Sequence, residues 1–291
     1  MAHSILAPTD FHTETIRVGD LTMNVALEGD PDAPLVLLLH GFPEFWYSWR
    51  HQIKALAAAG YRVAAPDQRG YNLTEKKPPY DLITLSNDAA GVITALGKEK
   101  AFVVGHDWGG GVAWIMGAYH PEMVEKVVIC NVPHPLVMAK MLRSSPRQLL
   151  KSWYMLFFQL PALPEALLAM RNYKALVDTL KSVSTVTPEE IEYFKVAWKQ
   201  PGALNGSLNW YRIAFRTLGK VAKRDLILKM PTRIIWGDPD PVVDRSAAEA
   251  SRKFAPGCDL IYLPGGGHFV QQERPDEVNQ LILAFLNGSN G

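Results

Sequence analysis

The chain has 291 residues, of which 48% are hydrophobic and 10% aromatic, so it can bury a large core as one domain or as a domain with an insert. Its 30 Lys and Arg residues nearly balance its 29 Asp and Glu residues, and the formal net charge is +1. This balance gives no electrostatic case for nucleic acid or an anionic membrane as a partner. A small neutral ligand fits the composition better than either of these charged partners.

Three features of the sequence indicate in which cellular compartment the protein resides. Cys130 and Cys258 are too few for a disulfide framework and lack the spacing of metal ligands, which indicates a reducing compartment. Residues 1–10 lack a basic segment followed by an apolar one, so we expect no signal peptide. No apolar run approaches the roughly 20 residues that span a bilayer. We therefore expect a cytoplasmic protein that does not enter a membrane.

Strand-like and helical segments alternate along most of the chain. Residues 13–18 and 21–27 flank Gly19 and Asp20 and predict an antiparallel hairpin at a sheet edge. Further strand-like runs follow at residues 35–40, 62–66, 101–105, 126–131, 232–236 and 260–263. This alternation predicts an α/β fold with a mostly parallel sheet covered by helices.

The alternation stops between His134 and Arg224, where large apolar residues recur at helical intervals between prolines. Helices are predicted at residues 149–160, 165–173, 174–183, 188–199 and 205–218, and Thr187 followed by Pro188 is a well-capped start for the fourth. We expect residues 1–133 and 225–291 to form the core, and residues 134–224 to form a helical cap inserted between the sixth and seventh strands. Such a cap would exclude water from a site at the strand ends.

The most informative segment is residues 105–110, with the sequence GHDWGG. It lies between an apolar strand-like run and an apolar helical run, and its glycines permit a sharp, strained turn. This pattern predicts a nucleophile elbow with Asp107 in the position that usually holds serine. A carboxylate with a pKa near 3.9 is ionised at neutral pH, needs no base before it attacks, and suits attack on an sp3 carbon. The alternative is that Asp107 only caps the following helix.

Two later strand ends offer partners for Asp107. A glycine-rich loop at residues 265–267 places His268 after one strand, and Asp240 follows the strand at residues 232–236. The chain order of nucleophile, acid and histidine is that of α/β-hydrolase triads. Asp238 and Asp244 remain alternatives for the acid.

A fourth strand end runs into Gly41 and Phe42. Hydrolysis of an ester on Asp107 would create negative charge on its carbonyl oxygen, and the backbone N–H groups of Phe42 and Trp108 are the expected donors to that oxygen. The alternative is an ordinary turn between a strand and a helix.

Together these motifs resemble the epoxide-hydrolase branch of the α/β-hydrolase superfamily over nearly the whole chain, from about Phe11 to Leu286. The shared signatures are HGFPE at residues 40–44, DQRGY at residues 67–71, GHDWGG at residues 105–110 and the His268 loop. Two cap tyrosines also match the family, Tyr154 and Tyr211. The resemblance implies that both phenols donate hydrogen bonds to an epoxide oxygen.

The resemblance further implies a reaction in which a small apolar epoxide becomes a vicinal diol through an alkyl ester on Asp107. Water activated by His268 and Asp240 would then hydrolyse that ester. No cofactor or metal is expected, because each chemical role has a side-chain or backbone candidate. Cap side chains such as Met138, Met155, Phe157, Leu167 and Trp198 are expected to set the pocket width, and exposed cap surface could support a homodimer.

Other activities of this fold remain as alternatives. Haloalkane dehalogenases share the ester chemistry but often carry asparagine after the His-Gly pair, where this chain has Phe42. Haloacid dehalogenases that act on fluoroacetate place arginines close after the nucleophile, where this chain has none before Arg143. A non-catalytic ligand-binding protein of the same fold is the third alternative.

Overall fold

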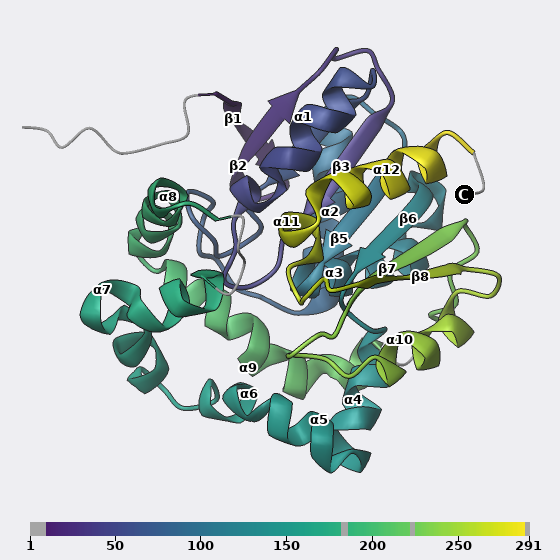
Figure 1. The fold of residues 1–291 in the computed structure, drawn as a ribbon. Helices are drawn as coiled ribbons and strands as arrows, with labels where there is room; N and C mark the ends of the chain where they lie inside the picture. The colour runs from purple at the N-terminus through teal and green to yellow at the C-terminus, as the bar shows by residue number, and fades with distance from the viewer. Residues whose placement is uncertain (1–9, 182–185, 222–224, 289–291) are drawn as a thin grey trace, which may run out of the picture.

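The structure is a computed structural model of the chain, and it describes residues 10–181, 186–221 and 225–288 (Figure 1). Its centre is an eight-stranded sheet with the order β1-β2-β4-β3-β5-β6-β7-β8. The strands are β1 His12–Val18, β2 Leu21–Glu28, β3 Leu35–Leu39, β4 Arg62–Pro66, β5 Ala101–His106, β6 Val124–Cys130, β7 Thr232–Asp238 and β8 Asp259–Pro264. The pairs β1·β2 and β2·β4 are antiparallel and the others are parallel, which confirms the predicted sheet and its edge hairpin.

Helices cover both faces of the sheet because successive side chains of its strands point to opposite faces. In β3, Leu35, Leu37 and Leu39 belong to a core cluster with α2 (Leu82–Ala95) and α3 (Asp107–Tyr119). Val36 and Leu38 belong to a second cluster with α1 (Arg50–Ala58) and α12 (Pro275–Leu286). Strands buried on both faces appear in the sequence as unbroken apolar runs, as residues 35–39 do.

The chain between β6 and β7 is helical (Figure 1). It contains α4 Pro135–Ser144, α5 Pro146–Lys151, α6 Trp153–Phe157, α7 Leu163–Lys181, α8 Pro188–Lys199 and α9 Ala203–Val221. These helices group beyond one end of the sheet, along the left and the lower part of Figure 1. The division into core and cap stays a prediction, and its boundary at residue 224 lies outside the described residues.

Several helices of this segment differ from the prediction. Helix α4 is not among the predicted helices, and the helix expected at residues 149–160 is interrupted at Ser152 between α5 and α6. The two helices expected at residues 165–173 and 174–183 are joined in α7, whose backbone is kinked at residues 170–173, and residues 182 and 183 lie outside the described residues. Apolar spacing continues across these breaks, so periodicity alone does not locate them. Helix α8 begins as predicted, with a capping box between Thr187 and Glu190.

The remaining short helices connect these elements. They are α10 Ser246–Ser251 and α11 Val270–Glu273, with single turns at Trp46–Trp49, Pro121–Met123 and Arg252–Phe254. Among the described helices, none is long and apolar enough to cross a bilayer.

Candidate active site

Asp107 follows β5 directly and is the first residue of α3. Its φ of 48° lies in the left-handed region, which a residue with a side chain adopts only at an energetic cost. Glycines make the turn possible, since a Cβ on Gly109 would lie 2.1 Å from the carbonyl oxygen of Leu39 and one on Gly41 would lie 2.5 Å from the Cβ of Asp107. The turn therefore presses the Asp107 carboxylate against the loop that follows β3.

That loop donates to the carboxylate. The backbone N–H of Phe42 donates a hydrogen bond to Oδ1 of Asp107 at 2.9 Å. This contact is the geometry expected of an oxyanion-hole donor, because charge that develops on Oδ1 would find the donor already in place. Trp108 lies in the first turn of α3 and lines the pocket beside Asp107. Its role as the second donor stays a prediction.

His268 lies between two carboxylates. Its Nδ1 is 2.9 Å from Oδ2 of Asp240, and its Nε2 is 3.6 Å from Oδ2 of Asp107. Burial lowers the pKa of His268, but the charges of Asp240 and Asp107 and the hydrogen bonds to them raise it more, so this pKa lies well above its ordinary value. The free protein therefore favours an imidazolium held between the two acids.

Asp240 is fixed on the far side of His268 by three donors. The side-chain amide of Asn131 donates to its Oδ2 at 2.8 Å, and the backbone N–H groups of Val242 and Val243 donate to its Oδ1 at 2.6 and 3.0 Å. Burial raises the pKa of Asp240, and the charge and hydrogen bond of His268 together with the other donors lower it more, so the group stays ionised.

The two alternative acids have other partners. Asp238 forms an ion pair with Arg245 at 2.7 Å. Asp244 accepts hydrogen bonds from the backbone and hydroxyl of Ser246 at 3.0 and 2.7 Å. Of the three carboxylates, the structure places Asp240 against His268.

A buried cluster beneath the site connects the Phe42 loop with the His268 loop. Oε2 of Glu44 accepts from the backbone N–H of Gly41 at 2.8 Å and lies 2.7 Å from Nδ1 of His106, whose Nε2 lies 2.8 Å from the carbonyl oxygen of His268. Burial raises the pKa of Glu44, but the charge and hydrogen bond of His106 and the Gly41 N–H lower it more, to about 2. An ionised Glu44 thus connects the Phe42 loop to the His268 loop through His106.

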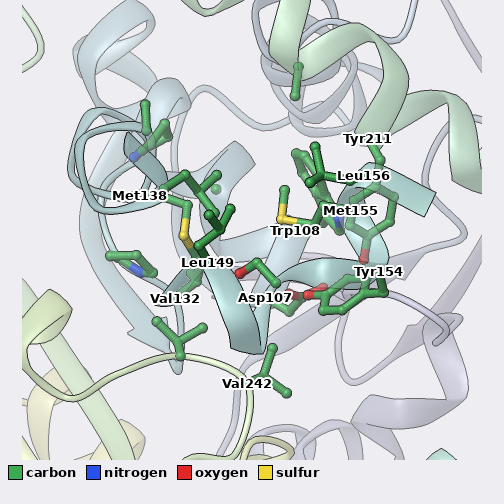
Figure 2. Close-up of a pocket in the computed structure, with 18 of the residues that line it drawn as sticks. Asp107, Trp108, Val132, Met138, Leu149, Tyr154, Met155, Leu156, Tyr211 and Val242 are labelled. Carbon is green, nitrogen blue, oxygen red and sulfur yellow. The ribbon is translucent and has the colours of Figure 1, made fainter. Parts of the chain in front are cut away.

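Tyr154, from α6, and Tyr211, from α9, form the wall opposite the strand ends (Figure 2). Their ring centroids are 6.0 Å apart, and the ring of Tyr211 is 4.9 Å from that of Trp108. Burial raises the pKa of both phenols, and nearby charge that includes that of Asp107 raises it further. Both side chains are therefore neutral hydrogen-bond donors at neutral pH.

The pocket between these walls has a volume of about 250 Å³. Figure 2 shows Asp107, Tyr154 and Tyr211 facing it together with Met138 and Leu149. Its lining is mainly apolar, as expected for a site that takes an apolar ligand.

Only part of the expected width-determining set lines this pocket. Met138 and Met155 do so, whereas Phe157, Leu167 and Trp198 do not, which corrects the expectation for these three. Trp198 packs elsewhere and donates its indole N–H to the carbonyl oxygen of Pro43 at 2.7 Å. Helical periodicity shows that such residues are inward-facing but does not distinguish core packing from pocket lining.

Comparisons with known proteins agree with this geometry. The family described as "alpha/beta hydrolase fold" matches residues 34–275. The chain is 45% identical over 277 residues to AB hydrolase superfamily protein YfhM of Bacillus subtilis (strain 168), covering 93% of this chain and 96% of that protein. It is 37% identical over 285 residues to Epoxide hydrolase 4 of Mus musculus, covering 93% of this chain and 78% of that protein. The chain belongs to the epoxide hydrolase family of α/β-hydrolase proteins.

A solved structure of this family superposes over nearly the whole chain. The crystal structure of Bacillus megaterium epoxide hydrolase in complex with an inhibitor matches with a TM-score of 0.86 at 29% sequence identity, covering 94% of this chain and all of the other. The structure adds two residues that support the site in this epoxide hydrolase family member and that the sequence motifs did not single out, Glu44 and Asn131. Glu44 ends the HGFPE segment, and Asn131 follows the last residue of β6 at the same sheet edge as Asp107. Their positions in the sequence could therefore have indicated that both residues lie near the site.

The described residues were also searched for metal-binding groups and for disulfides. They contain no group of three or more His, Cys, Asp or Glu side chains arranged to hold a metal ion. Cys130 and Cys258 are both buried free thiols.

Proposed function

We propose that the protein is an epoxide hydrolase that converts a small apolar epoxide and water into a vicinal diol. The observation that carries the proposal is the position of Asp107. Its carboxylate is held by the Phe42 N–H, lies 3.6 Å from His268, and faces a pocket whose opposite wall presents two phenols. No serine nucleophile is needed, because the aspartate itself forms the ester.

The first step is ring opening. Phe42 engages Oδ1 of Asp107, which leaves Oδ2 to attack a carbon of the epoxide. As the new C–O bond forms, the ring C–O bond breaks and its electron pair moves to the ring oxygen. Tyr154 and Tyr211 donate hydrogen bonds to that oxygen, and one of them transfers its proton and becomes a phenolate. The product of this step is a hydroxyalkyl ester on Asp107.

The second step is hydrolysis of the ester. Ester formation removes the negative charge of Asp107, which is one of the causes that raise the pKa of His268. The imidazolium therefore loses its proton more readily, and this proton returns to the tyrosine phenolate through solvent. The neutral imidazole then takes a proton from water, whose oxygen attacks the ester carbon. The resulting oxyanion on Oδ1 is stabilised by Phe42 and by the proposed donor Trp108.

Collapse of the tetrahedral intermediate completes the cycle. The bond between the Asp107 carboxyl carbon and Oδ2 breaks, and the leaving alkoxide takes the proton from His268 and departs as the diol. The proton left on the new carboxyl group passes to His268, which becomes an imidazolium again. Asp107, His268 and the phenol are then restored, and the net reaction adds one water to one epoxide.

The dehalogenase alternative has less support. Phe42 presents an aromatic ring at the position after His-Gly, and this ring packs against Phe158 and Tyr211 at centroid distances of 5.7 and 5.4 Å. It offers no polar donor to a halide. The two phenols are instead suited to an oxygen leaving group that needs a proton.

The test is diol release from a styrene-oxide-type substrate, with halide release from the corresponding alkyl halide measured in parallel. We expect diol and no halide from the wild-type protein. Asp240→Asn should lose most turnover, whereas Asp238→Asn, the matched control in the same turn, should keep it because Asp238 pairs with Arg245. Halide release without diol release would overturn the proposal.

A further inference from the structure

One face of α4 forms a wall of the pocket along nearly the whole helix. The residues that line the pocket from this helix are Pro135, Met138, Ala139, Leu142 and Arg143. Their spacing of three and four residues places them on a single helical face. The first four are apolar and the last is a cation at the carboxyl end of the helix, so the polarity of this wall changes along its length.

The beginning of α4 lies near the nucleophile and its end lies far from it. Val132, three residues before the helix, lines the pocket and would lie 2.4 Å from a Cβ on Gly110, within the elbow itself. Arg143 comes eight residues after Pro135, which corresponds to a rise of about 12 Å along the helix axis. The guanidinium therefore belongs to the end of the pocket remote from Asp107.

Arg143 is exposed, and within the described residues it forms no hydrogen bond or ion pair. The next arginine, Arg147, pairs with Asp244 at 3.2 Å. The sequence between Glu125 and Glu165 contains no acidic residue, so no neighbour along the chain supplies a carboxylate for Arg143. Among the residues that line the pocket, Arg143 and Asp107 are the two that carry charge.

We infer that Arg143 binds a carboxylate at the far end of the substrate, so that the pocket takes epoxides whose apolar chain runs along α4 between the two charged residues. The inference rests on the proposed function and adds a substrate class to it. A guanidinium fork matches the geometry of a carboxylate and can bind it through two parallel hydrogen bonds. The four apolar residues of α4 would contact the chain between the epoxide and the carboxylate.

The experiment compares two substrates that differ in charge alone, the terminal epoxide of undecenoic acid and its primary amide. Their chain length is close to the rise of α4 between Pro135 and Arg143. We expect wild-type kcat/KM to be about three- to tenfold higher for the acid, the range of one partly exposed charged hydrogen-bonded pair. Arg143→Gln should remove this preference through KM with kcat unchanged, and Arg143→Lys should retain part of it.

Two controls separate binding of the substrate carboxylate by Arg143 from the effect of removing any positive charge from α4 and from a preference for any acid. Lys140→Gln removes the same charge from an exposed position of the same helix that does not line the pocket, so it should keep the acid preference. The terminal epoxide of pentenoic acid is too short to reach both ends, and wild type should not distinguish it from its amide. Higher salt should reduce the preference for the long acid, since exposed ion pairs are screened.

The outcomes are distinguishable. If wild type hydrolyses the long acid and its amide equally well, or if Lys140→Gln removes the preference as Arg143→Gln does, the carboxylate site is wrong although the proposed function stands. A loss of turnover on both long substrates in Arg143→Gln would instead assign the residue to helix stability, through its favourable position at a helix carboxyl end. If wild type hydrolyses none of the epoxides, the proposed function itself fails.

Discussion

The two walls of the pocket are held in place by different interactions. On the strand-end wall, Asp107, His268 and Asp240 are fixed by hydrogen bonds, several of them from backbone N–H groups. On the helical wall, Tyr154 and Tyr211 are fixed mainly by edge contacts between aromatic rings, with Phe158 5.6 and 5.0 Å from their centroids. Hydrogen bonds fix the position of an atom, whereas ring contacts tolerate small shifts.

This difference assigns different tasks to the two walls. In the proposed mechanism the strand-end wall needs fixed atoms, because attack and proton transfer depend on distances near 3 Å. The helical wall only has to bring donors and apolar surface to substrates of different shape. Substitutions on the strand-end wall should therefore change the chemical steps, and substitutions on the helical wall, the two phenols excepted, should change which epoxide is accepted.

The largest effect is expected where the helical wall takes part in the chemistry. The double variant Tyr154→Phe/Tyr211→Phe should slow ring opening by more than the roughly 100- to 1,000-fold typical of one lost donor. Each single variant should be milder, since the other phenol still donates, and effects of groups that act together are not additive. Rapid-mixing measurement of ester formation gives the rate.

Tyr61→Phe is the matched control for the tyrosine variants. Its hydroxyl donates to Asn287 at 2.7 Å and the residue does not line the pocket, so ring opening should be unchanged. Parental turnover in the double variant would remove both phenols from the mechanism and leave the helical wall with packing alone.

The second effect belongs to the strand-end wall. His268→Gln should still form the ester and then stall, with turnover reduced by about 100- to 10,000-fold, the range for loss of a general base. Mass spectrometry after mixing with excess epoxide should show the protein heavier by one substrate. His120→Gln, at a half-buried histidine that contacts Asn87 and does not line the pocket, should turn over normally. Normal turnover of His268→Gln would assign the base elsewhere.

The pH dependence should separate the two chemical steps. Because His268 must be neutral to take a proton from water, hydrolysis of the ester should fall up to tenfold per pH unit below the pKa of His268 in the ester. That pKa should be lower than in the free protein, where the Asp107 charge helps to raise it. The pH dependence of single-turnover rates gives the pKa of His268 in the ester, and NMR titration of His268 gives its pKa in the free protein. Equal values would contradict the proposed coupling.

The smallest effect on turnover, with a larger one on stability, is expected at Glu44. Glu44→Gln removes one member of a buried ion pair and should lower the free energy of unfolding by about 3–5 kcal/mol. Since the pKa of Glu44 falls from 4.5 to about 2 on folding, its contribution is present above pH 4.5 and is lost as the pH falls toward 2. Denaturant unfolding at neutral and acidic pH measures the loss of unfolding free energy and its dependence on pH. Glu14→Gln, at an exposed position, is the control. A variant as stable as wild type would contradict this role.

The strand-end wall was more predictable from the sequence than the helical wall. Strand ends, glycines and chain order locate Asp107 and His268, because a parallel sheet brings these ends to one edge. The same reasoning favoured Asp240 but left Asp238 and Asp244 as alternatives, because all three lie at or after the end of β7 and differ only in the partners that the folded loop supplies. On the helical wall, the apolar periodicity of the sequence did not predict α4. The face of α4 that lines the pocket and carries Arg143 therefore could not be predicted either.

The proposed ester on Asp107 is tested most directly by the origin of the oxygen added to the epoxide. A single turnover with the protein in excess, run in heavy-oxygen water, distinguishes an ester on Asp107 from direct attack by water. In the ester route the oxygen of the diol comes from the carboxylate, and water replaces it there. We expect an unlabelled diol and a labelled peptide that contains Asp107. A labelled diol with an unlabelled peptide would contradict the proposed ester.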